Sequence, residues 1–134
     1  MRVNCRSYLV PADETVNHTR RYTSAGIDEG WEGCGQGVNK TQHAANGDPV
    51  INTHRFPDMA KLVDHGHAAG LTMGWYQNGC ACGESVEKDI NYRGDVRQLH
   101  ALGFDAVKFD GCGAQRNNSR YAELMKATGK NYSM

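Results

Sequence analysis

The sequence has no excess of either charge and no long apolar run. Its 15 basic residues balance 15 acidic residues and are mixed with them along the 134 positions. No basic stripe therefore favours nucleic acid or an anionic membrane surface as a partner. No apolar run reaches the roughly 18 residues of a membrane span, and the first residues lack the apolar core of a secretory signal. We expect the partner to be a neutral molecule.

Two families of motif are also missing. No glycine-rich phosphate loop follows an expected strand, which argues against a doubly wound nucleotide-binding fold. The paired C-x-x-C and H-x-x-x-H spacings of zinc sites are absent, so a zinc site at "CAC", from Cys80 to Cys82, is weaker than a disulfide interpretation. We expect no metal and no cofactor. The histidines interpreted as surface or helix-face residues are His43, His54, His65, His67 and His100.

Cysteines and glycosylation sequons are plentiful for so short a chain. Five cysteines indicate an oxidising compartment rather than the cytosol. Export features inside the sequence, without a signal at its start, predict that it is not a whole protein. The N-x-S/T sequons, which agree with export, begin at Asn17, Asn39, Asn117 and Asn131.

Helices that end in glycine lead directly into strands. The stretch "FPDMAKLVDHGHAAG" has helical apolar spacing and stops at Gly70, where the strand "LTMGWY" begins. A second helix is expected over about 87–102, followed by the strand "FDAVKF", and a third over 121–128. Such helix-to-strand connections build parallel sheets, so the predicted fold class is α/β. The apolar residues expected to face inward are Met59, Leu62, Val63, Ile90, Val96 and Leu99.

Polar side chains, glycines and a cysteine gather where three of the expected strands end. In a parallel sheet these ends meet at one edge, where functional residues collect. One such cluster alone would indicate an ordinary turn or a solvated charge, but three aligned clusters favour a site. The motifs are "GIDEGWEGC" with Asp28 and Glu29, "WYQNGCACG" with Tyr76, and "KFDGCG" with Asp110.

The last of these strands places a cation and a carboxylate together. Alternation along a strand puts Lys108 and Asp110 on one face and Val107 and Phe109 on the other. Burying such a pair for stability alone gains little, because desolvation offsets the attraction. We therefore interpret Asp110 as a functional carboxylate that a nearby ammonium keeps ionised.

Five motifs follow one another along the sequence: "GIDEGW", "RFPDM", "GLTMGWY", "CACG" and "GFDAVKFDGC". Together and in this order they resemble landmarks of glycoside hydrolase family 27, the α-galactosidases and α-N-acetylgalactosaminidases. The resemblance covers residues 26–134 and implies a partial (β/α)8 barrel, roughly its strands two to four with their helices. Residues 1–25 stay unassigned. The resemblance further implies retaining hydrolysis of terminal α-galactosides and a secreted, lysosomal or vacuolar location.

The resemblance also implies roles for individual residues. Asp110 would be the catalytic nucleophile, which needs a second carboxyl group about 5 Å away as the acid. Asp28 and Glu29 would accept hydrogen bonds from galactose hydroxyls. Glu29 stands where the family usually has an aspartate, and its extra methylene moves the carboxylate outward. The other substrate-binding residues implied are Tyr76 and Lys108 in the sugar pocket and Trp31 beside it, against the apolar face of the sugar.

A disulfide pairing follows from the same resemblance. It pairs Cys82 with Cys112, which would tie two site loops together. Cys34 and Cys80 lie at neighbouring strand ends and could form a second bridge, which would leave Cys5 over.

The resemblance leaves several outcomes open. A whole barrel takes about 250 residues, more than this sequence has. A further strand is expected to begin at "NYSM". No carboxylate of the sequence matches the family's acid/base motif. We therefore expect a truncated form that lacks the acid. The alternatives are a galactose-binding remnant without catalysis and an unrelated α/β protein. Galactose and N-acetylgalactosamine are not distinguished, and the oligomeric state is unknown.

Overall fold

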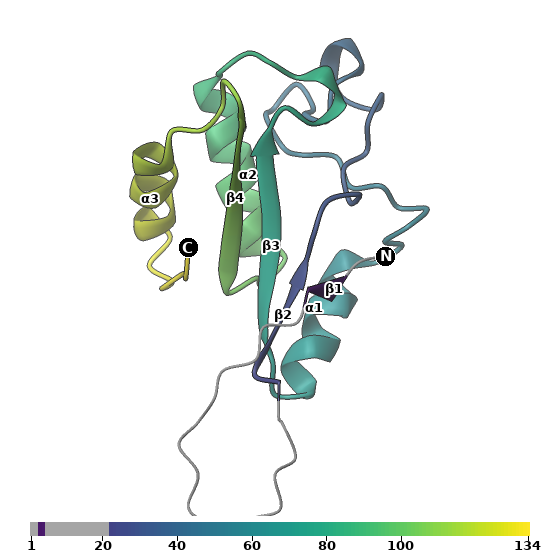
Figure 1. Ribbon diagram of the computed structural model, residues 1–134, viewed down its shortest axis with the longest axis vertical. Helices are drawn as coiled ribbons and strands as arrows, with labels where there is room; N and C mark the ends of the chain where they lie inside the picture. Colours follow the sequence, from purple (N-terminus) through teal and green to yellow (C-terminus); the bar gives the residue numbers. More distant parts are fainter. Residues whose placement is uncertain (1–2, 5–21) are drawn as a thin grey trace, which may run out of the picture.

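The computed structural model describes residues 3–4 and 22–134, with one four-stranded sheet in the order β1-β2-β3-β4. The last three strands run parallel, whereas β1 lies antiparallel beside β2 (Figure 1). The predicted parallel α/β fold is therefore confirmed. The strands are β1 (Val3–Asn4), β2 (Ser24–Ile27), β3 (Thr72–Gly79) and β4 (Ala106–Gly113).

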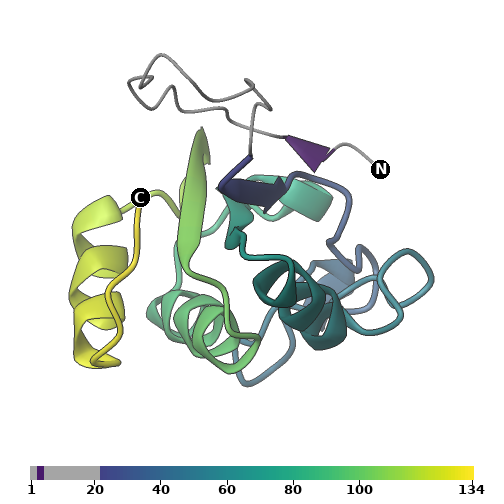
Figure 2. The same cartoon turned by 90° about the horizontal axis from the view of Figure 1, so that it is seen from below.

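Helices α1, α2 and α3 lie on one side of the sheet, as Figure 2 shows. The Asp58 side chain caps α1 by accepting a hydrogen bond from the backbone N–H of Lys61. Asn117 caps α3 in the same way through Arg120, so this helix starts earlier than the predicted Tyr121. The helices are α1 (Met59–Ala68), α2 (Asp89–Ala101), α3 (Asn118–Ala127) and the 3-10 turns η1 (Val38–Lys40) and η2 (Ala81–Gly83).

The inward face of α2 differs from the prediction at one residue. Val96 and Leu99 are buried as expected, but Ile90 is 46% exposed. Tyr92, four residues before Val96, takes the inward position instead and is 2% exposed. Ile90 lies two residues before Tyr92, and such a spacing places it on the opposite side of a helix.

Aromatic rings form the centre of the core between the sheet and the helices. The ring of Trp75 in β3 packs against two others, with its centroid 4.5 Å from that of Trp31 and 5.1 Å from that of Phe104. Phe109 of β4 stacks on Tyr121 of α3 at 4.3 Å, which confirms that Val107 and Phe109 face the helices. These contacts fix the opposite face of β3 and β4, with Tyr76 and Lys108, as the face away from the core.

The chain begins a further parallel pairing beside β4. The backbone N–H of Val107 donates to the carbonyl of Ser133, and the N–H of Ser133 donates to the carbonyl of Asp105. The expectation that a strand begins at "NYSM" is therefore met by one bridge. In the described part of the chain, no helix combines the length and the apolar character that a membrane crossing needs.

His43 lies inside the protein rather than on its surface, where the sequence placed it. It is 4% exposed, its Nδ1 lies 2.7 Å from Glu84 and its Nε2 lies 2.9 Å from Asp95. Both carboxylates have further donors, since Asn91 donates to Glu84 and Tyr121 donates to Asp95. The cluster joins the loop after β2 to the loop after β3, to α2 and to α3.

Both ring nitrogens of His43 face carboxylate oxygens, an arrangement that the doubly protonated ring satisfies. Burial would lower the pKa of His43, but the hydrogen bonds to Asp95 and Glu84 raise it to about 9. Burial also opposes ionisation of Glu84, yet His43 holds the pKa of Glu84 below its ordinary value. Burial raises the pKa of Asp95, the more enclosed carboxyl. We take the cluster as one imidazolium shared by two acids.

Replacing His43 with glutamine should lower the free energy of unfolding by about 3 kcal/mol near neutral pH, because two buried acids lose their cation. The folded pKa of about 9 lies above the ordinary 6.5, so the contribution is complete below pH 6.5 and is lost as the pH rises through 9. Urea unfolding at about pH 7 and about pH 10 should show the gap between parent and variant narrowing. The exposed His54→Gln variant is the control, and a pH-independent gap would contradict the assignment.

Candidate active site

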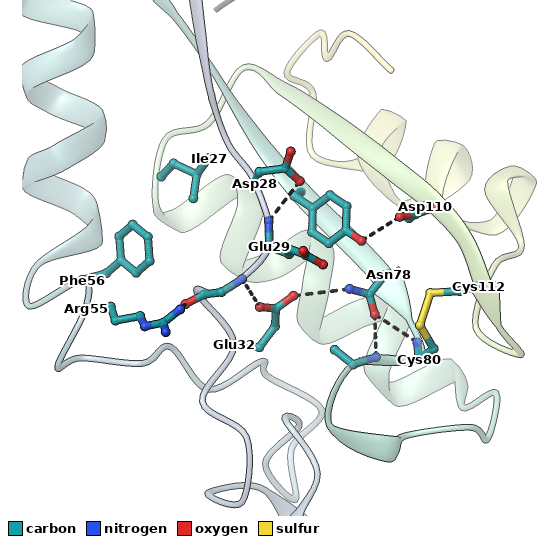
Figure 3. A pocket seen from close by; sticks show the side chains of 13 residues that line it. Ile27, Asp28, Glu29, Glu32, Arg55, Phe56, Asn78, Cys80, Asp110 and Cys112 are labelled. Atoms are coloured by element: carbon teal, nitrogen blue, oxygen red, sulfur yellow. Dashed lines mark hydrogen bonds between the residues drawn. A yellow bond between two sulfur atoms is a disulfide. The ribbon is translucent and has the colours of Figure 1, made fainter. Parts of the chain in front are cut away.

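A pocket of about 780 Å³ opens at the carboxyl ends of the three parallel strands (Figure 3). Each strand and its following loop contributes polar groups, which is the arrangement predicted from the three strand-end motifs. The residues whose side chains or backbone carry the argument below are Asp28, Glu29 and Gly30 after β2, Tyr76 and Asn78 in β3, Asp110 in β4, and Glu32 and Arg55 in the loops.

Asp110 lies in an irregular part of β4. Between two register points, β3 advances from Gln77 to Gly79, whereas β4 advances from Phe109 to Gly113, so β4 carries two extra residues (four steps against two). Bulges of this kind redirect side chains beside functional sites. The carboxylate of Asp110 lines the pocket as a result.

Tyr76 donates a hydrogen bond to Asp110. The Tyr76 hydroxyl lies 2.8 Å from Oδ2 of Asp110, and the backbone N–H of Gly111 lies 2.9 Å from Oδ1. Burial raises the pKa of Tyr76, and the bond to Asp110 raises it further, so the phenol stays protonated at neutral pH. Tyr76 is therefore a permanent donor that orients one oxygen of the Asp110 carboxylate.

Lys108 contacts a different carboxylate from the one expected. Its Nζ lies 3.3 Å from Oδ1 of Asp28 and 4.8 Å from the centre of the Tyr76 ring. The Lys108 side chain is 58% exposed, so the pair with Asp28 is a surface pair of small energy rather than a buried one. Lys108 thus neutralises the Asp28 side of the pocket, and the sequence argument for its pairing with Asp110 was wrong.

Asp28 and Glu29 both reach the pocket because β2 has already ended at Ile27. The backbone N–H of Glu29 donates to Oδ1 of Asp28, which begins the turn. Gly30 continues it with φ of +99°, a conformation that side chains rarely adopt. Adjacent residues that would alternate in a strand therefore share one side in this turn.

Trp31 does not lie where the sequence interpretation put it. The side chain is fully buried against Trp75, and its Nε1 donates to the backbone carbonyl of Tyr76 at 2.8 Å. An indole enclosed in the core cannot stack on a sugar in the pocket. Trp31 instead joins the loop after β2 to β3.

Glu32 and Asn78 are pocket residues that the sequence interpretation missed. Each is 8% exposed, and they contact each other through a hydrogen bond of 3.3 Å. Glu32 stands in the charged stretch "DEGWEGC", and Asn78 stands before a glycine, so both patterns are typical of solvated turns. No local signal distinguishes them from surface residues.

The disulfides differ from both predicted pairs. Cys34 bonds to Cys82 and Cys80 bonds to Cys112, with Cα atoms 5.0 and 5.5 Å apart. The predicted bridges Cys82–Cys112 and Cys34–Cys80 are therefore wrong. Gly79 pairs with Gly113 across the sheet and so brings Cys80 beside Cys112. Cys5 lies outside the described residues.

The cysteines of "CAC" are thus both in disulfides, which leaves neither sulfur as a thiolate ligand for zinc. Across residues 3–4 and 22–134, no three His, Cys, Asp or Glu side chains are grouped to hold a metal ion.

No protein-family model matches the sequence, and no curated protein matches it either. Solved structures do match. The α-galactosidase of Saccharomyces cerevisiae with raffinose superimposes with a TM-score of 0.66 at 16% identity, over 83% of this chain and 26% of that chain. α-Galactosidase I of Mortierella vinacea gives a TM-score of 0.62 at 21% identity, over 80% of this chain and 28% of that chain.

The chain has the fold of part of an α-galactosidase. Its parallel strands and helices correspond to a partial (β/α)8 barrel, as the sequence motifs implied. The chain spans about a quarter of the length of these enzymes, 26% and 28% in the two cases. Identities of 16% and 21% carry the fold alone, so activity and substrate are matters for proposal.

The two bridges can be distinguished by single substitutions. Cys80→Ser should release Cys112, and Cys82→Ser should release Cys34, because each loses its own partner. Alkylation of the folded variants followed by peptide mass analysis identifies the released thiol, with the labelling of the parent as background. Each substitution should also lower stability by about 2 to 4 kcal/mol. Release of Cys112 by Cys82→Ser would contradict the assigned pairing.

Proposed function

We propose that the pocket binds the terminal galactose of α-galactosides and that Asp110 is the nucleophile of their retaining hydrolysis. The observation that carries the proposal is the position of Asp110, which lines the pocket at the end of a parallel strand with the Tyr76 hydroxyl 2.8 Å away. The likeness to α-galactosidases, one of them solved with raffinose, supports a carbohydrate ligand.

The two oxygens of the Asp110 carboxylate have different roles in the proposed reaction. One oxygen attacks the anomeric carbon while the glycosidic C–O bond breaks and the leaving oxygen takes a proton from an acid. Water then attacks the anomeric carbon of the resulting glycosyl ester and gives a proton to the conjugate base of that acid. The ester bond breaks, which releases the sugar with its original configuration and regenerates the Asp110 carboxylate. The donor Tyr76 holds the other oxygen, so the attacking oxygen has a fixed direction.

Sugar hydroxyls need acceptors and donors in a small space. Asp28 and Glu29 supply carboxylate oxygens on one side of the pocket, and Lys108 supplies an ammonium beside Asp28. Asp28 already accepts from Lys108 and from the backbone N–H of Glu29, so its contacts suit an acceptor. Glu29 carries one methylene more than the family's usual aspartate. This extra length moves the carboxylate and would therefore change which sugar the pocket prefers.

The alternative role for Glu29 is that of the acid, which would carry a proton instead of serving as a carboxylate acceptor. Asp28 is paired with Lys108, and Glu32 accepts hydrogen bonds with both of its oxygens, so both are held as acceptors. The family resemblance places the acid on a residue that matches nothing in this sequence. An experiment can distinguish an acid at Glu29 from an acid on another residue.

Galactose binding without hydrolysis is the second candidate function. Asp110 is exposed to solvent in the described part of the chain, and Lys108 is 58% exposed on the same face. A solvated carboxylate is a weaker nucleophile than one in a site that excludes water. Galactose titration in the absence of turnover would favour this candidate.

We further propose a secreted or vacuolar location. Two disulfides form within the described chain, and such bonds persist in oxidising compartments. The sequon asparagines Asn39, Asn117 and Asn131 are exposed, as glycosylation requires, whereas Asn17 lies outside the described residues.

Asp110→Asn should abolish release of dinitrophenol from a dinitrophenyl α-galactoside. This leaving group departs without protonation, so its release tests the nucleophile alone. We expect a loss of at least about 10³-fold, since removal of a nucleophile is among the largest single effects known. The exposed Asp64→Asn variant is the control. Equal rates in parent and Asp110→Asn would remove Asp110 from its assigned role.

Glu29→Gln distinguishes an acid from a binding residue. If Glu29 is the acid, raffinose hydrolysis should fall on the order of 10² to 10⁴-fold, whereas the dinitrophenyl substrate should react nearly as before. If Glu29 only binds sugar, KM should rise for both substrates. A parent chain that releases dinitrophenol but never hydrolyses raffinose would place the acid on another residue.

A further inference from the structure

A buried carboxylate in the pocket wall takes part in no step of the proposed reaction. Glu32 is 8% exposed and both of its oxygens are occupied. Oε2 accepts from the backbone N–H of Gly30 at 2.7 Å, and Oε1 accepts from Nδ2 of Asn78 at 3.3 Å. A carboxylate in such a place costs free energy unless donors compensate it, so the two bonds account for its burial.

Asn78 continues the contact to the next loop. Its Oδ1 accepts from the backbone N–H groups of Cys80 and Ala81, at 3.0 and 2.6 Å. These two donors fix the amide oxygen, which leaves the NH₂ group facing Glu32. One line of hydrogen bonds thus runs from the loop after β2 to the loop after β3, as Figure 3 shows.

The N–H that Glu32 holds belongs to the residue directly after the acidic pair. Gly30 has φ of +99°, a conformation that residues with a side chain rarely adopt. The conformation of this turn determines where the carboxylates of Asp28 and Glu29 point. A group that fixes this N–H fixes the direction of both acceptors.

We infer that Glu32 is a positioning residue, which through Gly30 and Asn78 sets the geometry of Asp28 and Glu29, the acidic pair of the proposed galactose site. The inference rests on the proposed function for the identity of the sugar. Glu32 contacts no substrate in this account, and it acts through the turn that it holds.

A reciprocal exchange tests the inference. In Glu32→Gln the new NH₂ group meets a donor in either orientation, the Gly30 N–H or the Asn78 NH₂, and in Asn78→Asp two carboxylates meet. Each single variant therefore displaces the side chain at position 32 from the place where it holds the Gly30 N–H. In the double variant the glutamine NH₂ donates to the aspartate and its oxygen accepts from Gly30, which restores every bond. Glu123→Gln, with a side chain 70% exposed on α3, removes the same charge elsewhere as the control.

Two quantities are measured on the full chain of each variant. The temperature is kept well below each variant's thermal unfolding midpoint, so that a loss of global stability alone changes neither quantity. Hydrogen exchange of the Gly30 amide should quicken at least about 10-fold in each single variant and return in the double variant. The Kd for galactose should rise about 10-fold or more in each single variant. In the double variant it should return to within about threefold of the parent's Kd.

The two readouts fail separately. Unchanged Gly30 exchange in Glu32→Gln, or a double variant worse than both single variants, overturns the positioning role whatever the ligand does. Altered Gly30 exchange with a galactose Kd equal to that of the parent overturns it as well, because the turn would then not govern the acceptors. If Gly30 exchange follows the expected pattern but the parent binds no galactose, the hydrogen-bond line stands and the proposed function falls.

Discussion

The register between β3 and β4 is the constraint on which the core and the pocket both depend. It pairs Trp75 with Val107 on the helix-covered face and Tyr76 with Lys108 on the other face. A slip of one residue would exchange the two sets and bury a lysine in the core. The irregularity after Gln77 then adds length to β4 alone, so the same pairing that closes the core also aims a carboxylate at Tyr76.

Elements whose cause is local could be predicted from the sequence. The helix that begins after Asp58 and ends before Gly70 contains its own cap, its own apolar spacing and its own terminating glycine. Alternation alone places Val107 and Lys108 on opposite faces of β4. The meeting of three strand ends at one edge also follows from local evidence. The helix-to-strand connections predict parallel strands, and the carboxyl ends of parallel strands all lie at the same edge of the sheet. Fold class and the main pocket residues therefore came from short stretches.

Features that depend on distant partners could not be predicted. His43 resembles any loop histidine until the chain brings it to Glu84 and Asp95, which are 41 and 52 residues away. Glu32 needs Asn78, 46 residues on, before it differs from a solvated charge. Trp31 was misplaced for the same reason, since an indole beside an acidic turn suits a sugar or a core equally well. In each case the burial of one side chain is decided by residues that its own neighbourhood does not contain.

The two disulfides overlap along the chain, because one spans Cys34 to Cys82 and the other spans Cys80 to Cys112. Any single cut of the backbone between Cys34 and Cys112 therefore separates two pieces that at least one bridge still joins. The loops after β2 and β3 and the end of β4 form a covalent rim that a protease can nick without dividing it. The opposite ends of the same strands have no such bond among the described residues, so hydrogen bonds and packing alone keep them together.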